Sequence, residues 1–202
     1  MTKCAPAYAR GVPTPRRSVL AMAVLSMLAE GPAHPYRMQQ LIKERHKDDV
    51  VNVSQRTVIY QTIERLLREE LIAVESTERA ERRPERTTYA ITAAGRETLA
   101  EWLRTMLSTP AREFPEFPAA LAFLPTISPA EATEALATRC ERLRQRLAAL
   151  DQELDQGASF LPRLFLVESE FQRQVVAAEL QYVQALTEDL RAERITWPWP
   201  MG

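Results

Sequence analysis

Residues 55–72, with the sequence QRTVIYQTIERLLREELI, constrain the fold of this chain more than any other stretch. Ile59, Ile63 and Leu66 recur at the spacing that places apolar side chains on one stripe of an α-helix. The opposite face begins with polar side chains that can hydrogen-bond to phosphates or base edges, namely Gln55, Arg56, Thr57, Tyr60 and Gln61. The pattern predicts an amphipathic helix that packs on one side and presents a polar leading edge on the other.

A basic loop between two β-prone runs follows this helix almost at once. The runs are residues 71–75 and 87–91, and the arginines of the loop are Arg79, Arg82, Arg83 and Arg86. A loop that is merely solvated is the alternative, because glutamates alternate with these arginines. A helix with a polar leading edge followed by a basic hairpin is typical of a winged helix-turn-helix. In that fold the helix enters the DNA major groove and the hairpin reaches nearby phosphates or the minor groove.

Start and stop signals complete the first domain. Ser18 is suited to cap a helix over residues 18–29, Gly31-Pro32 ends that helix, and Pro35 begins the next one. Thr92 is suited to cap an exit helix over 93–107. We therefore predict a mobile arm at residues 1–17, a winged helix-turn-helix domain with exit helix at 18–108, and a proline-rich linker with a short helix at 109–127.

Long helices dominate the remaining chain. The residues Ser128-Pro129-Ala130-Glu131 are a helix-start signature, and an unbroken heptad seam runs from Leu136 to Leu154. A final helix of about 30 residues from near Pro162 has two apolar faces, of which so small a chain can bury only one. The pattern predicts a helical dimerisation domain at 128–194, a tail at 195–202, and a mainly α protein that forms a homodimer. The candidate dimerisation residues are Leu143, Leu147, Leu150, Phe171, Val175, Tyr182, Val183 and Leu186.

Composition narrows the class of protein further. Residues 1–108 hold 17 Lys and Arg against 13 Asp and Glu, whereas residues 109–202 hold 9 against 14, so a basic half precedes an acidic one. No run approaches the ~20 apolar residues of a membrane span. Two distant cysteines favour a reducing cytoplasm, and two histidines offer no zinc-ligand spacing. No nucleophile–base pair or phosphate loop stands out, so we expect neither an enzyme nor a bound cofactor or metal.

Three segments together carry a resemblance to a known family. VLAMAVLSMLAEGPAHPYRM, VIYQTIERLLREELI and TTYAITAAGRETLAEWL are similar to the opening helix, recognition helix and wing of the PadR family of transcriptional regulators. The two long helices resemble the family's longer branch, with its extended dimerisation domain. One departure is Glu70, which stands where the family usually has the glycine that closes the recognition helix. Glu70 must therefore accept a left-handed conformation or end the helix differently.

The resemblance implies a ligand-responsive repressor that binds double-stranded DNA. The predicted homodimer would relate two recognition helices by a dyad, which predicts an inverted-repeat operator. The resemblance also implies a small aromatic or amphipathic effector, for which the candidate lining residues are Trp102, Phe114, Phe117 and Phe123. Ordinary core aromatics are the alternative for those four. Arg65 joins the DNA-binding candidates as a phosphate or intrahelical contact. Two other functions stay open, a MarR-type regulator and a winged-helix protein-interaction scaffold that does not bind DNA.

Overall fold

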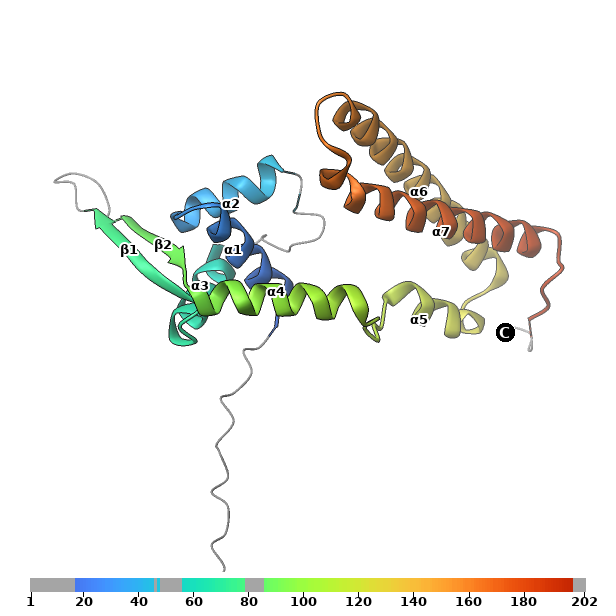
Figure 1. Ribbon diagram of the computed structural model, residues 1–202. Coiled ribbons are helices and arrows are strands. Elements are labelled where there is room, and N and C mark those ends of the chain that lie inside the picture. The colour runs from blue at the N-terminus through green and yellow to red at the C-terminus, as the bar shows by residue number, and fades with distance from the viewer. Residues whose placement is uncertain (1–16, 46, 48–55, 79–85, 198–202) are drawn as a thin grey trace, which may run out of the picture. The chain divides into compact units, whose positions relative to one another are not determined.

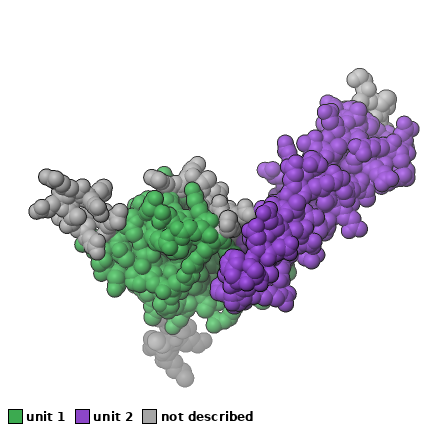
Figure 2. Space-filling view, turned by 90° about the horizontal axis from the view of Figure 1, so that it is seen from above, with its two compact units in different colours: residues 1–112 green, residues 113–202 purple. Residues whose placement is uncertain are grey.

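The computed structural model describes residues 17–45, 47, 56–78 and 86–197, which form two compact units, residues 1–112 and 113–202 (Figure 2). The first unit contains α1 (Val19–Glu30), α2 (Pro35–Glu44), α3 (Arg56–Arg68), β1 (Ile72–Glu78), β2 (Arg86–Ile91) and α4 (Ala93–Ser108). The second contains α5 (Glu116–Ala122), η1 (Leu124–Thr126), α6 (Pro129–Ala158), η2 (Arg163–Phe165) and α7 (Val167–Arg191). The predicted mainly α class is confirmed. Of the arm expected at residues 1–17, residues 1–16 lie outside the described part of the chain.

Helices α1, α2 and α3 pack around one apolar core, and the β1–β2 hairpin extends from them as the wing (Figure 1). The fully buried members of this core include Leu25 of α1, Met38 of α2 and Ile63 of α3. The strands are antiparallel and pair Ile72 with Ile91 at the base of the hairpin. The apolar stripe predicted for α3 is thus the face that packs on the core.

Side-chain caps define where the helices of the first unit begin. The Ser18 hydroxyl accepts a hydrogen bond of 3.1 Å from the backbone N–H of Ala21, and the Thr92 hydroxyl accepts one of 3.0 Å from that of Gly95. These two predicted caps are confirmed. The His34 imidazole accepts a 3.1 Å bond from the Tyr36 N–H through Nδ1, and Pro35 takes the first position of α2, where its missing N–H costs nothing.

Helices α6 and α7 lie side by side as a long antiparallel hairpin that forms most of the second unit (Figure 1). The predicted start of α6 is confirmed, because the Ser128 hydroxyl accepts from the Glu131 N–H at 3.2 Å and the Glu131 carboxylate accepts from the Ser128 N–H at 2.9 Å. Gly157 does not interrupt this helix. A methyl group added there would lie 2.6 Å from Leu166, so glycine allows the turn after α6 to fold back.

The last helix differs from its prediction in where it begins. Pro162 is followed by the short 3-10 helix η2, and α7 itself starts at Val167 and has 25 residues. The heptad seam of α6 packs on α7 of the same chain, with Leu136, Cys140 and Leu150 buried.

This packing divides the candidate dimerisation residues into two groups. Leu150 and Val183 are buried within the hairpin, and Leu143, Leu147 and Leu186 are partly buried beside them. These five side chains pack along the seam between α6 and α7 of the same chain, and their contact with a partner stays a prediction. Phe171, Val175 and Tyr182 are exposed on the other side of α7.

Candidate nucleic-acid interface

The polar leading edge of α3 is presented to solvent by the apolar face behind it. Ile59 and Ile63 are each 1 % exposed, whereas Tyr60 is 46 % exposed and both Thr57 and Gln61 are exposed. We call Thr57, Tyr60 and Gln61 the exposed edge of α3. Arg68 is also exposed and follows Gln61 seven residues later, so the helical period continues this edge to the end of the helix.

Several predicted contact residues belong to segments beside this edge. Arg56 begins α3 and Arg86 begins β2, although their side chains are outside the described part of the structure. Gln55, Arg79, Arg82 and Arg83 also lie outside the described residues. The structure therefore brings Thr57, Tyr60 and Gln61 together, and it places Arg86 at the start of the strand that returns from the hairpin loop.

Arg65 has a different environment from the exposed edge. Its side chain is partly buried, and Nη2 donates a 3.2 Å hydrogen bond to the Ser18 hydroxyl, which is the N-cap of α1. Arg65 thus links α3 to the first turn of α1, 47 residues away in sequence. This contact gives it a part in positioning the helix.

Tyr89 of β2 ties the wing to the helical core, a role that the sequence pattern did not reveal. Its backbone N–H and carbonyl exchange hydrogen bonds of 3.0 Å with Ala33, which forms a bridge between the α1–α2 turn and the hairpin. Burial raises the pKa of the Tyr89 phenol, and the nearby Tyr60 and Glu64 raise it further. The Tyr89 side chain of the wing therefore lies near Tyr60 and Glu64 of α3.

The joint between α3 and the wing is held by Glu70, Leu71 and Thr92. Glu70 has a φ of 56°, so it adopts the left-handed conformation, which is the first of the two expectations for this position. The Leu71 N–H donates to the Leu66 carbonyl at 2.9 Å, and the Thr92 N–H donates to the Leu71 carbonyl at 3.1 Å. This closure satisfies the last carbonyls of α3 and sets the direction in which β1 leaves the helix.

Gly95 allows α4 to approach this joint closely. A methyl group added at Gly95 would lie 2.0 Å from the Leu71 carbonyl oxygen and 2.8 Å from Ile91. The glycine therefore serves packing between α4, α3 and the wing, and a side chain cannot fit there without moving the backbone.

A match to a protein family covers most of the first unit. The profile of the transcriptional regulator PadR-like family matches residues 24–101, which run from α1 through α4. The winged-helix unit of this chain is a PadR-like domain. It carries the resemblance expected from the three sequence segments.

Solved structures extend the similarity to the second unit of the chain. Bacillus subtilis PadR in complex with operator DNA has 20% sequence identity and a TM-score of 0.68, covering 86% of this chain and 99% of that one. The same protein in complex with p-coumaric acid has 18% identity, a TM-score of 0.66 and coverage of 86% and 99%. The Vibrio cholerae virulence activator AphA has 20% identity, a TM-score of 0.65 and the same coverage. At these identities the likeness establishes the fold. A comparison with curated proteins found no match.

The four aromatic residues considered for an effector site belong to two different units. Trp102 is buried in the core of the first unit, whereas Phe117 and Phe123 line a groove in the second unit. Phe114 is 81 % exposed and does not line that groove. A shared role of these four residues in an effector site stays a prediction.

Two further findings concern metal binding and membrane-spanning helices. Among the described residues, no three His, Cys, Asp or Glu side chains gather as metal ligands would. Each helix within the described part is too short or too polar to span a lipid bilayer.

Proposed function

We propose that this PadR-like protein is a DNA-binding transcriptional regulator, and more closely a ligand-responsive homodimeric repressor of an inverted-repeat operator. The observation that carries the proposal is the exposed edge of α3 on a helix whose other face is fixed in the core. Polar side chains on a rigid helix beside a hairpin are suited to the DNA major groove. The solved structure with operator DNA, cited above for its fold, supports the same function.

The proposed contacts divide by what each side chain can reach. Residues at the leading end of α3 read base edges, and arginines of the wing neutralise phosphates. The first group is Gln55, Arg56, Thr57, Tyr60 and Gln61, and the second is Arg79, Arg82, Arg83 and Arg86. Arg65 supports the helix through its hydrogen bond to Ser18, and we also propose it as a phosphate contact.

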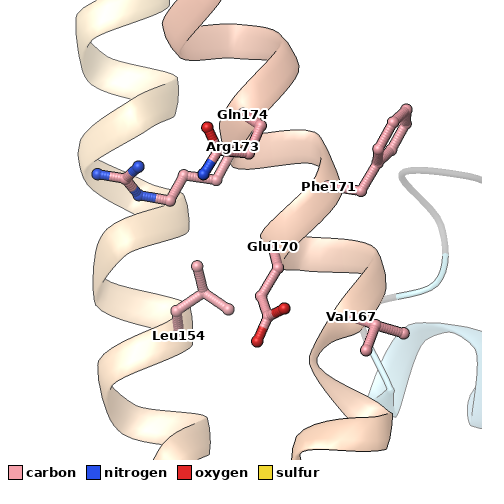
Figure 3. Close-up of a pocket in the computed structure, with 6 residues that line it drawn as sticks. All are labelled: Leu154, Val167, Glu170, Phe171, Arg173 and Gln174. Carbon is pink, nitrogen blue, oxygen red and sulfur yellow. The ribbon is translucent and has the colours of Figure 1, made fainter.

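The dimer is proposed from the outer face of α7. Phe171, Val175, Ala178, Tyr182 and Ala185, which we call the outward stripe, are spaced four, three, four and three residues apart and are all exposed in the single chain. Figure 3 shows the contrast between the two sides of this helix, with Arg173 reaching across to α6 and Phe171 pointing away from it. A second heptad seam of this kind is typical of a helix that packs on another subunit.

Dimerisation would relate two copies of α3 by a two-fold axis, which matches the symmetry of an inverted repeat. Half-sites about one helical turn apart, or a small multiple of it, are expected. Release of the operator by a small molecule is the proposed regulatory step, and the solved complex of B. subtilis PadR with p-coumaric acid supports a ligand of that size.

The deciding experiment is a gel shift of the purified protein with DNA flanking its own gene, followed by footprinting. We expect salt-dependent binding and protection of two half-sites related by a dyad. Protection of one unpaired half-site would exclude the inverted repeat. The absence of DNA binding at low salt would favour the protein-interaction scaffold instead.

A further inference from the structure

A groove of about 710 Å³ lies inside the second unit, between α5 and the first half of α6. Its walls are apolar and come from Phe117 and Leu121 of α5, Phe123 and Leu124 after it, and Leu136 and Leu143 of α6. The volume is within the range of sites for small organic ligands. Phe123 is 70 % exposed, so much of its aromatic surface at the groove is left uncovered by the described residues.

Charge at the α5–α6 groove has a single sign. Arg139, Arg142 and Arg146 occur three and four residues apart on α6 and all line the groove. The described residues that line it include neither Asp nor Glu. Arginine side chains beside apolar walls favour a ligand that combines an apolar body with a negative charge.

The three arginines differ in what already holds them. Arg139 donates through Nε to the Glu179 carboxylate at 2.6 Å, and its guanidinium carbon lies 3.7 Å from the centre of the Phe117 ring. Arg146 donates to Gln172 at 3.0 Å. Arg142 is exposed, and the described part of the chain provides it with no hydrogen-bond or ion-pair partner. Arg142 is therefore the cation available to a ligand, while Arg139 keeps Phe117 in place.

We propose that the α5–α6 groove binds a small amphipathic anion, with its apolar body against Phe117, Phe123 and Leu136 and its charged group at Arg142. Such an anion would carry a carboxylate or sulfonate, whose oxygens accept hydrogen bonds from the N–H groups of a guanidinium. Its role as the effector of this protein rests on the function proposed above.

Two fluorescent probes that share one apolar body test the charge requirement. 1-Anilinonaphthalene-8-sulfonate is an anion, and N-phenyl-1-naphthylamine is its neutral counterpart without the sulfonate. We expect the anion to bind the full-length protein more tightly. Arg142→Gln should weaken the anion about fivefold and leave the neutral probe unchanged, since an exposed ion pair contributes modestly. Phe123→Ser should weaken both probes, because both use the apolar wall.

Arg144→Gln is the matched control. Arg144 is an exposed arginine of the same helix, and it does not line the groove. Its Nη1 atom lies 3.5 Å from Oε2 of Glu141. We expect it to leave both affinities unchanged. Equal losses in Arg142→Gln and Arg144→Gln, or equal affinity of the two probes for the unmutated protein, would overturn the proposed site.

A second arm separates the site from the proposed function. The anionic probe should release promoter DNA from the unmutated protein in a gel shift and should do so less well from Arg142→Gln. A protein that binds DNA and the anion but keeps the same DNA affinity would refute the effector role. A protein that binds no DNA would overturn the proposed function and the effector role together, while the probe titrations would still decide whether the groove binds anions.

Discussion

The hydroxyl of Thr92 donates a 2.8 Å hydrogen bond to the backbone carbonyl of Glu70. The same hydroxyl caps α4 by accepting from the Gly95 N–H, so one side chain joins the end of α3 to the start of α4 across the wing. This bond holds Glu70 in its left-handed conformation, which is unfavourable for a residue with a Cβ atom.

Glu70→Gly should therefore stabilise the first unit. Glycine adopts a positive φ without steric cost, which favours the folded state by about 1 kcal/mol, although its greater freedom in the unfolded chain offsets part of the gain. Urea denaturation followed by circular dichroism measures the change. Glu64→Gly on the same helix is the control, and we expect it to destabilise by about 1 kcal/mol because Glu64 lies mid-helix. A loss of stability in Glu70→Gly would contradict the assigned conformation.

Gly95→Ala should destabilise the first unit by about 3 kcal/mol, the upper range for overpacking. The added methyl group would meet the backbone carbonyl of Leu71 at 2.0 Å, and backbone cannot rotate away as a side chain can. Gly31→Ala is the matched control, because a methyl group there has nothing within 4 Å. In thermal and urea denaturation, Gly95→Ala should have a clearly lower melting temperature and free energy of unfolding than Gly31→Ala. Equal stabilities would mean that α4 does not approach the joint as closely as described.

Val175→Glu should produce a folded monomer, whereas Leu150→Glu should unfold the α6–α7 hairpin. Val175 belongs to the outward stripe, where a charge in the single chain remains solvated, but Leu150 is 1 % exposed and a buried carboxylate without a partner costs several kcal/mol. Light scattering reports the mass and circular dichroism the helix content.

Gln184→Glu serves as the control for Val175→Glu, since it adds the same charge at an exposed position of α7 outside the outward stripe. We expect it to keep the oligomeric state of the unmutated protein. A monomeric unmutated protein at micromolar concentration would remove the basis for the dimer.

Helix and wing residues should affect DNA binding differently. Arg56→Ala should relax sequence preference, with a loss of about 1–3 kcal/mol at the operator and less on random DNA. Replacing Arg82, Arg83 and Arg86 by alanine should weaken all DNA alike and lower the salt slope by about one unit for each lost phosphate contact. Affinities for operator and random DNA at several salt concentrations distinguish the two effects.

Gln152→Ala, at an exposed position of α6, is the control for alanine substitution at a polar surface site. It should leave the sequence preference and the salt slope unchanged. A wing variant that kept its full salt slope while losing only the operator would reverse the assignment of helix and wing.

Local sequence alone determined the starts of α1, α4 and α6 and the buried face of α3. The capping hydrogen bonds of Ser18, Thr92 and the Ser128–Glu131 capping box join residues only three positions apart. They can therefore be predicted from the sequence without knowledge of the fold. The apolar stripe of α3 follows from helical spacing in the same way. The left-handed Glu70 was one of two expectations, since the helix end is local but its conformation depends on Thr92, 22 residues later.

Tertiary structure decided which residues meet across the chain. The bridge between Ala33 and Tyr89, the bond from Arg65 to Ser18 and the close approach of Gly95 to Leu71 join residues that no periodic pattern relates. It also decided which apolar face of α7 is buried on α6 and which stays outside. Both faces have the same helical spacing, and only the packing partner distinguishes them, because burial is a property of contacts between segments and not of either segment alone.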